Sequence, residues 1–510
     1  MNEATHLPSI VRNLLTDPAC YDHAVGTMQL VETHISWVVL TGEFAYKIKK
    51  PLDLGFLDFS SLSLRQHACE DEVRLNRRLA AGFYLGVVGI TGSEDAPHIN
   101  SSANDLQQPV IEYAVKMRQF PLGMTLDSLD ERGELGTEQI DCLATQLAKF
   151  HESGCDIADI GSNWGEPKLI AQPVDENFKH LSDQAHDSEK LKRVDALKSW
   201  CAAEHMRLTP LMHERKVKGK IRECHGDMHL GNLAWVDGQV VIFDCIEFNP
   251  ALRWIDVVSE VAFCFMDLLH RQHGDLAMRF LNAWLEITGD YEGIGLLRYY
   301  AVYRALVRAK VAALRADQSE NKTESMQEVN AYLLLAQQLI QAMPTQLYIT
   351  HGLSGSGKTT LSQKMLQIFG MIRLRSDIER KRLAGMEATE QSGSGIGQGM
   401  YTKSFGRKTY VHLSKLTDTL LFAGWPVIVD AAFLERWQRD LFRGVARRRG
   451  VSFLILDIKA DINILRGRIS QRIEQGKDAS EANLEVLQNQ IKTAQPLEED
   501  ELCEILSLNI

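Results

Sequence analysis

One short segment of the chain has the residue types that bind a row of phosphates. Gly352–Thr359 reads Gly-Leu-Ser-Gly-Ser-Gly-Lys-Thr and fits G-x-x-x-x-G-K-[ST] without departure. Its glycines let backbone N–H groups turn inward around a phosphate, and a following helix adds a favourable dipole. The segment therefore predicts a P-loop for ATP and Mg²⁺, with Thr359 as a metal ligand. Its expected nucleotide-binding residues are Gly352, Ser354, Gly355, Ser356, Gly357, Lys358, Thr359 and Thr360.

Charged residues downstream of this segment could complete a phosphate-transfer site. Asp377 follows a short apolar stretch and could take the proton of a substrate hydroxyl, or it could only cap a helix. Asp430 ends another apolar stretch and could hold Mg²⁺ through water, or it could be an ordinary turn residue. A later helical segment has three arginines that could close over the transferring phosphate, with a solvated basic face as the alternative. They are Arg466, Arg468 and Arg472, and Arg468 is our catalytic candidate.

A second segment, far from the first, also has the residues of phosphoryl transfer. His225 to Asn232 reads His-Gly-Asp-Met-His-Leu-Gly-Asn, and Asp244 follows a short apolar stretch beyond it. Phosphoryl transfer needs a base that orients the acceptor hydroxyl and groups that hold Mg²⁺. We expect Asp227 to be the base and Asn232 and Asp244 to be the metal ligands. A different metal site, made by His225, Asp227 and His229, is the weaker alternative.

This second segment resembles the catalytic loop of aminoglycoside phosphotransferases and related protein-kinase-like enzymes, which use the HGD form. The resemblance implies that Lys47, in Ala45-Tyr46-Lys47, binds the α/β phosphates of ATP and that Glu72 is its ion-pair partner. Lys49 lies on the same expected strand face and could hold the role of Lys47, and Glu70 is the rival of Glu72.

The resemblance also implies that the backbone of Lys116–Phe120 contacts adenine. The chain departs from the kinase pattern at one point, because no G-x-G-x-x-G precedes Lys47. Another loop, Thr33–Ser36, would then cover the phosphates.

The C-terminal part, from about Gln346 to Leu497, resembles small P-loop kinases such as gluconate kinase, polynucleotide kinase and zeta-toxin-like phosphotransferases. Over nearly its full length the chain is similar to bacterial bifunctional aminoglycoside phosphotransferase/ATP-binding proteins. Leu54–Phe59 and Glu247–Pro250 add to that match.

The elements that must position these residues separate into three regions. Residues 28–121 look strand-rich with one helix at Arg65–Leu79, and 122–343 look helical, with a loop at Asp317–Gln327. An Asp237-Gly238 turn would form the hairpin that returns Asp244 to Asn232. Beyond about 344, short apolar strands alternate with helices, which is typical of a parallel sheet.

We therefore expect a fold of the α/β and α+β classes. A protein-kinase-like, two-lobed domain would occupy 1–343, with its N-lobe at about 28–121 and its C-lobe at about 122–343. A parallel-sheet P-loop NTPase domain would occupy 344–510.

Composition narrows the class of partner. The chain has 510 residues, 24% of them charged, and a net charge of −11, which argues against nucleic acid as the main partner. Nine scattered cysteines without a CxxC pair suggest reduced thiols in the cytoplasm. We find no signal peptide and no apolar stretch long enough to span a membrane.

Together these features predict a tandem ATP- and Mg²⁺-dependent phosphotransferase, a kinase acting on small molecules that bear hydroxyl groups. The alternative is a nucleotide-dependent regulatory switch, or a toxin-like P-loop kinase controlled by the N-terminal domain.

Overall fold

The computed structural model describes residues 7–55, 57–99, 109–184, 188–318, 322–388, 390–392, 398–475 and 479–509. By packing, the chain divides into two compact units. Unit 1 contains Met1–Cys142, Lys149–Leu169 and Met212–Glu260, and unit 2 contains Leu143–Ala148, Ile170–Leu211 and Val261–Ile510. Unit 2 thus groups most of the helical region with the C-terminal sheet. Phe56, in the Leu54–Phe59 match, lies outside the described residues.

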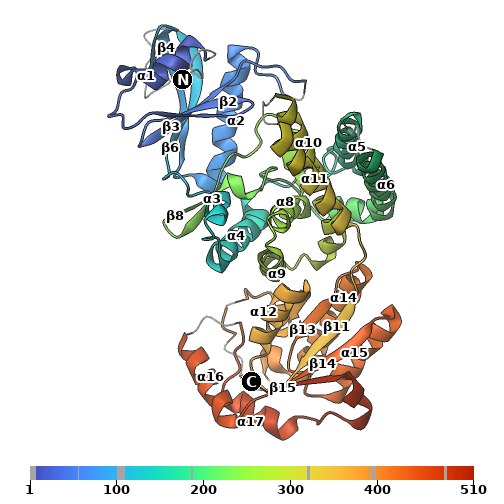
Figure 1. Ribbon diagram of the computed structural model, residues 1–510. Coiled ribbons are helices and arrows are strands. Elements are labelled where there is room, and N and C mark those ends of the chain that lie inside the picture. Colours follow the sequence, from blue (N-terminus) through green and yellow to red (C-terminus); the bar gives the residue numbers. More distant parts are fainter. Residues whose placement is uncertain are drawn as a thin grey trace. The chain divides into compact units, whose positions relative to one another are not determined.

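Unit 1 is built on a six-stranded antiparallel sheet, with strand order β1-β2-β3-β6-β4-β5 (Figure 1). Its strands are β1 (Gln29–Glu32), β2 (Ser36–Leu40), β3 (Phe44–Lys49), β4 (Tyr84–Ser93), β5 (Ala96–Ile99) and β6 (Val110–Arg118). These strands confirm the strand-rich pattern expected for residues 28–121. Because side chains alternate along a strand, Lys47 and Lys49 of β3 point to the same face of the sheet.

Helix α2 (Leu62–Ala80) packs on β4 and β6, and its side chains reach that same face. It begins at Ser61, whose hydroxyl accepts a hydrogen bond from the Leu64 amide. Arg65 and Glu112 of β6 form a buried ion pair at 2.9 Å, which fixes the first turn of the helix against the sheet. These contacts at the start of α2 position the helix, and therefore Glu72, against the sheet.

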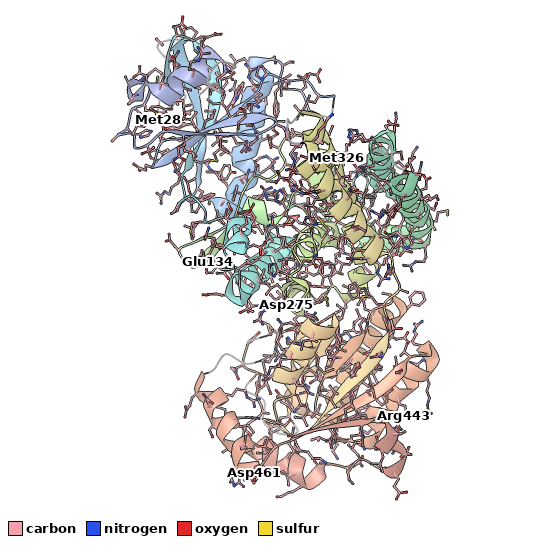
Figure 2. The ribbon with its side chains drawn as sticks, in the orientation of Figure 1. Met28, Glu134, Asp275, Met326, Arg443 and Asp461 are labelled. Carbon is pink, nitrogen blue, oxygen red and sulfur yellow. The ribbon has the colours of Figure 1, made fainter. Side chains whose placement is uncertain are left out.

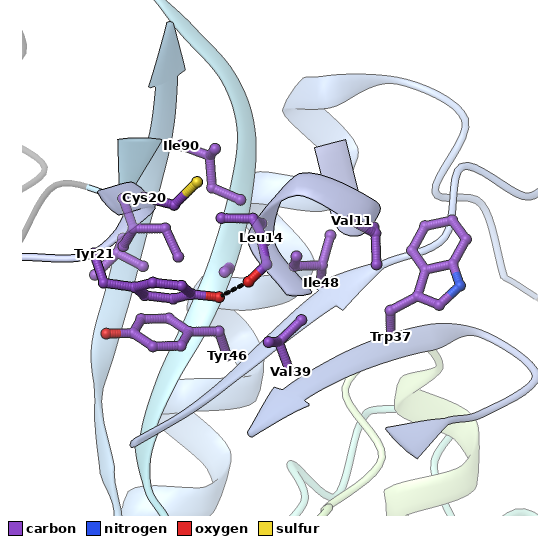
Figure 3. Close-up of a cluster of buried hydrophobic side chains, with 12 residues drawn as sticks. Val11, Leu14, Cys20, Tyr21, Trp37, Val39, Tyr46, Ile48 and Ile90 are labelled. Atoms are coloured by element: carbon purple, nitrogen blue, oxygen red, sulfur yellow. Dashed lines mark hydrogen bonds between the residues drawn. The ribbon is translucent and has the colours of Figure 1, made fainter. Parts of the chain in front are cut away.

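The opposite side of the sheet is covered by an apolar cluster that includes α1 (Ser9–Thr16). Figure 3 shows Val11 and Leu14 of this helix beside Val39, Tyr46 and Ile48 of the sheet. The Tyr21 hydroxyl donates a hydrogen bond to the Leu14 carbonyl at 2.5 Å, so the buried phenol is satisfied. The cluster packs against β2 and β3 on the face of the sheet opposite to Lys47 and Lys49.

The rest of unit 1 carries the second predicted loop. Strand β7 (Ile221–Glu223) precedes it and pairs with β10 (Trp254–Asp256), and the hairpin of β8 (Leu233–Val236) and β9 (Gln239–Ile242) follows it. The turn at Asp237-Gly238 has φ values of 51° and 74°, as a two-residue hairpin turn requires. The predicted hairpin is therefore confirmed, and the Phe243 amide donates to the Asn232 carbonyl at 3.1 Å.

Helices fill the middle of the chain. They are α3 (Leu126–Glu131), α4 (Thr137–Lys149), α5 (Pro167–Asp183), α6 (Ser188–Val217), α7 (Pro250–Arg253), α8 (Val257–His270), α9 (Gly274–Thr288), α10 (Ile294–Gln318) and α11 (Lys322–Leu339). The loop expected at Asp317–Gln327 is wrong at Asp317–Gln318, which end α10, and from Lys322 onward, where α11 begins and buries Val329 and Tyr332 on one face. Residues 319–321 lie outside the described residues. Helix α11 forms because the apolar residues after the polar stretch pack into the core, and the polar residues form its solvent-facing first turns.

Unit 2 ends in a five-stranded parallel sheet with order β12-β13-β11-β14-β15. Its strands are β11 (Gln346–His351), β12 (Ile372–Arg375), β13 (Val427–Asp430), β14 (Ser452–Lys459) and β15 (Ile505–Asn509). The helices around it are α12 (Lys358–Phe369), α13 (Ser376–Leu383), α14 (Lys403–Phe422), α15 (Arg436–Arg449), α16 (Ile462–Gln475) and α17 (Leu484–Thr493). Figure 1 shows α12 on one side of the sheet and α14 and α15 on the other, as right-handed crossovers require.

The mixed α/β fold class is confirmed: unit 1 has a six-stranded antiparallel sheet with helices, and unit 2 has a five-stranded parallel sheet that alternates with helices. Helix α11 ends at Leu339 and β11 begins at Gln346. The predicted boundary at 343 and 344 falls between these elements, and the assignment of domains to either side stays a prediction. Within the described ranges, no helix combines the length and apolar character that crossing a membrane requires.

Candidate functional site

Two lysines of β3 converge on one glutamate of α2 in unit 1. Lys47 Nζ lies 2.9 Å from Glu72 Oε1, and Lys49 Nζ lies 2.5 Å from Glu72 Oε2. Each lysine has a second carboxylate partner: Lys47 pairs with Asp244, and Lys49 pairs with Glu247. The two lysines therefore have different surroundings, and only Lys47 contacts a predicted metal ligand.

Exposure separates the two lysines further. Lys49 and Glu247 are buried, whereas the Asp244 side chain is 41% exposed, so the Lys47 end of the cluster opens toward solvent. Burial alone would lower the pKa of Lys47, but the charges of Asp244 and Glu72 raise it well above its usual value. Lys47 is thus held as a cation at the mouth of the cluster, where a phosphate could contact it. Glu70, the rival of Glu72, is exposed and bonds Gln66.

The HGD loop brings Asp227 and Asn232 together. Asn232 Nδ2 donates to Asp227 Oδ2 at 3.1 Å and to the Asp227 carbonyl at 3.0 Å, and His229 Nε2 lies 3.4 Å from Asp227 Oδ2. The Asn232 nitrogen is therefore directed at Asp227, and its amide oxygen, the atom that could bind a metal, lies on the other side of the group. Asp244 follows β9 with φ of 65°, and its amide donates to the Tyr84 hydroxyl at 3.1 Å.

His225 fastens this loop to the strand end before Asp244. Its Nδ1 accepts a hydrogen bond from the Asp227 amide at 3.2 Å, and its Nε2 donates to the Phe243 carbonyl at 2.8 Å. Burial lowers the pKa of His225, which keeps the ring neutral as this bonding pattern requires. With both ring nitrogens engaged by the backbone, the alternative metal site using His225 and His229 is disfavoured.

Sequence reasoning missed Glu260 of α8, which anchors the start of the loop. Both of its oxygens accept from the His225 amide, at 2.9 and 3.0 Å, and His151 Nε2 lies 3.7 Å from Oε2. Burial would raise the pKa of Glu260, but the hydrogen bond and charge of His151 and the contacts with His225 lower it to about 2. Together with Cys224, His151 and Glu260 form a group of possible metal-ligand atoms that lie within 4.8 Å of one another. The hydrogen bonds from the His225 amide explain the burial of Glu260 as a residue that holds the HGD loop.

Sequence reasoning also missed Glu223 of β7, which three arginines surround. Arg74 and Arg78 come from α2, with Nη1 atoms 3.1 and 3.2 Å from Glu223 Oε2, and Arg253 Nε lies 3.1 Å from Oε1. The helix that carries Glu72 is thereby fastened to the strand that leads into the HGD loop. No local motif marks Glu223 or Glu260, whereas Glu247 belongs to the Glu247–Pro250 segment that added to the family resemblance.

The P-loop of unit 2 joins β11 to α12 with the backbone that its glycines require. Gly352 has φ of 148° and Gly355 has φ of 83°, and a Cβ atom on them would lie 2.6 Å from the Ile458 carbonyl and 2.9 Å from the Leu465 carbonyl. Among the residues that the structure describes, Ser356 Oγ is buried without a hydrogen-bond partner. A cradle that no larger residue fits, with an unsatisfied hydroxyl in it, suits a phosphate group.

Lys358 lies at the centre of this loop. Its Nζ donates to the carbonyls of Gly352 at 3.0 Å and Leu353 at 2.7 Å. Burial lowers the pKa of Lys358, and the nearby charges of Asp430 and Asp377 partly offset that effect. The two predicted carboxylates therefore lie close enough to act on the P-loop lysine. Thr359 and Thr360, in the first turn of α12, are exposed.

Each carboxylate sits at the end of a strand. Asp430 is the last residue of β13 and accepts from Ser362 Oγ at 3.2 Å. Asp377 is in the first turn of α13, directly after β12, and pairs loosely with Arg380 at 3.7 Å. The cap residue of α13 is Arg375, so Asp377 does not cap the helix. This edge is where an open parallel sheet binds its ligands.

The three predicted lid arginines of α16 differ in their contacts. Arg468 Nη1 donates to the Gly355 carbonyl at 3.3 Å, so it reaches the P-loop itself. Arg472 bonds the Ala482 carbonyl, and Arg466 is exposed. The P-loop Ser354 amide donates to Gln490 Oε1 of α17 at 2.9 Å, a contact that sequence reasoning did not foresee.

Comparison with known proteins gives relatives for the whole chain and for each part. The uncharacterized proteins Rv2004c of Mycobacterium tuberculosis and Mb2027c of Mycobacterium bovis are each 29% identical over 474 residues, 91% of this chain and 91% of their own. A sugar kinase structure from Janibacter sp. is similar over 32% of this chain and 86% of its own, with 24% identity and a TM-score of 0.26.

A choline/ethanolamine kinase family protein from Mesorhizobium loti is similar over 63% of this chain and 90% of its own. The identity is 10% and the TM-score is 0.38. The model of the AAA domain family matches residues 347–497, which include the P-loop, Asp377, Asp430 and Arg468.

Proposed function

We infer that this chain is a tandem ATP-dependent phosphotransferase, with one ATP and Mg²⁺ site in unit 1 and one in unit 2. The acceptors would be small molecules that bear hydroxyl groups. The observation that carries this proposal is the pairing of Lys47 with both Glu72 and Asp244, because it joins a phosphate-binding cation to a metal-binding carboxylate. A separate P-loop with its own carboxylates supports the second site.

In unit 1, Asp227 would act as the base. Its carboxylate is 34% exposed and is oriented by Asn232 and His229, so it can accept the proton of an acceptor hydroxyl. Asp244 and the Asn232 amide oxygen would hold Mg²⁺, which neutralises phosphate charge when bound. Lys47 would then move its contact from Asp244 to the α/β phosphates, while Glu72 keeps it in place.

In unit 2, the P-loop backbone and Lys358 would hold the β and γ phosphates. Asp430 and the Thr359 hydroxyl would hold Mg²⁺, and Asp377 would orient the acceptor hydroxyl and take its proton. Arg468, already on the Gly355 carbonyl, would turn to the γ-phosphate and stabilise charge that develops during transfer.

We place both activities in the cytoplasm. All nine cysteines are free thiols, which suits a reducing compartment. The acidic balance of the chain favours small-molecule acceptors over nucleic acid.

A screen of hydroxyl-bearing metabolites for ATP consumption tests the proposal. The full-length chain is assayed as wild type, Lys358→Ala and Asp227→Asn. We expect at least one acceptor whose turnover is lost only in Asp227→Asn, or one lost only in Lys358→Ala. ATP binding without turnover on any acceptor would instead favour the nucleotide-dependent switch.

A further inference from the structure

Helix α9, which precedes the P-loop sheet in the chain, fastens to the edge strand of that sheet. Asn282 Oδ1 accepts from the Arg373 amide at 2.7 Å, and Asn282 Nδ2 donates to the Met371 carbonyl at 3.0 Å. Strand β12 is at the sheet edge, where backbone groups lack a neighbouring strand. The buried Asn282 amide therefore takes the place of a neighbouring strand at the Met371 carbonyl and the Arg373 amide, which lie on either side of Ile372.

Four residues then form a chain of contacts from α9 to Asp430. Glu286 Oε1 accepts from Arg373 Nε at 2.7 Å, and Arg373 Nη1 lies 3.5 Å from Ser362 Oγ. Ser362 Oγ lies 3.2 Å from Asp430 Oδ2 and 3.1 Å from the Thr359 carbonyl, so these two acceptors share its one hydrogen. Arg373, Ser362 and Asp430 are buried, and the Glu286 side chain is 11% exposed. Polar contacts in such a dry setting are strong and directional.

The C-terminal end of α9 also holds the helix that carries Asp377. Arg382 of α13 donates to the carbonyls of Glu286 at 2.5 Å and Ile287 at 3.2 Å. A cation at the C-terminal end of a helix is favoured by the helix dipole and satisfies carbonyls that the helix leaves unpaired. Both strand-end carboxylates of the P-loop site are thus linked to α9.

We propose that helix α9 contributes to the P-loop site because its residue Glu286 positions the carboxylate of Asp430. Glu286 fixes the Arg373 guanidinium, Arg373 fixes the Ser362 hydroxyl, and Ser362 fixes Oδ2 of Asp430, the carboxylate that would help to hold Mg²⁺. The residues lie within unit 2, and α9 lies outside residues 347–497 that match the AAA domain model. The inference rests on the proposed Mg²⁺ and ATP site of the P-loop.

Titration of Mg²⁺ in an ATP-turnover assay tests this inference. All variants are made in the full-length chain with Asp227→Asn, so that the remaining turnover comes from the P-loop site. Glu286→Gln keeps the shape of the side chain and removes its charge. We expect it to raise the Mg²⁺ concentration for half-maximal turnover about 10-fold, the effect typical of groups that orient a metal ligand. The KM for ATP at saturating Mg²⁺ should change less than about twofold.

Two further variants separate positioning from simple stabilisation. Ser362→Ala removes the link itself, so Glu286→Gln should add nothing to the Mg²⁺ shift in the double variant. Arg373→Lys keeps the charge but cannot hold Glu286 and Ser362 at once, so it should reproduce the shift. The matched control is Asp275→Asn, an exposed carboxylate in the first turn of the same helix, which should leave the Mg²⁺ dependence unchanged (Figure 2).

The outcomes distinguish the inference from the proposed function. If Lys358→Ala in this background leaves turnover intact, the P-loop assignment itself fails. If Lys358→Ala abolishes turnover while Glu286→Gln and Arg373→Lys keep the parental Mg²⁺ dependence, only the role of α9 is overturned. A lower Tm in Glu286→Gln with an unchanged Mg²⁺ requirement would also overturn it, because the contact would then be structural alone.

Discussion

Lys47 Nζ lies 2.9 Å from Glu72 Oε1, and this ion pair joins the central strand of the unit 1 sheet to helix α2. The other oxygen of the same carboxylate holds Lys49. The sequence left both lysines as candidates for the phosphate-binding role. Their second partners suggest different tasks, because Asp244 is half-exposed beside Lys47 and Glu247 is buried beside Lys49.

Replacing each lysine by methionine should therefore give different defects. Lys47→Met should lower kcat/KM of the unit 1 reaction by about 100-fold, the loss expected when one phosphate-stabilising donor is removed. Lys49→Met leaves buried Glu247 without its cation and should reduce the free energy of unfolding by about 3–5 kcal/mol. Steady-state kinetics and denaturant unfolding measure the two effects, and the reverse pattern would assign the phosphate-binding role to Lys49.

Asp227→Asn should remove phosphotransfer in unit 1 while sparing nucleotide binding. Loss of a general base lowers kcat by about 10²- to 10⁴-fold, whereas the lysine and the metal ligands that hold ATP are unchanged. Single-turnover kinetics with the acceptor found by the screen gives the rate, and equilibrium binding of an ATP analogue gives the affinity. Turnover near the wild-type rate would show that Asp227 is not the base.

The stability of unit 1 should depend on pH through Glu260. Its pKa is about 2 in the folded chain against 4.5 for an unperturbed glutamate, so its contribution is full above about pH 4.5 and is lost as pH falls toward 2. That difference corresponds to stabilisation on the order of 3 kcal/mol. Glu260→Gln should lower the Tm at pH 7 and flatten its decline between about pH 5 and 3. An unchanged slope in that range would contradict the proposed role of Glu260.

Local patterns predicted the parts of the fold that depend on neighbours in sequence. The P-loop, the HGD loop and the Asp237-Gly238 hairpin each set their own backbone, so their residues could be found without the structure. The contacts between Asn282 and Arg373, or between Glu223 and Arg74, join residues far apart in the chain and have no local signature. Strand β15 depends on such a contact too, since only its pairing with β14 makes it a strand.

The polar segment after α10 shows the opposite error. Its composition suggested a loop up to Gln327, but the apolar face that begins further along, at Val329, packs α11 against α10 and carries the helix back to Lys322. Tertiary packing here overrides local composition. The same rule explains why α9 could be predicted as a helix, whereas its position against β12 could not.

The central claim is that one chain holds two separate ATP sites. Isothermal titration calorimetry of the full-length protein with a non-hydrolysable ATP analogue and Mg²⁺ counts them directly. Two analogues should bind per wild-type chain, one per chain of Lys358→Ala or Lys47→Met, and none in the double variant at the same concentrations. A single analogue bound to the wild type, or two still bound to Lys358→Ala, would contradict the account.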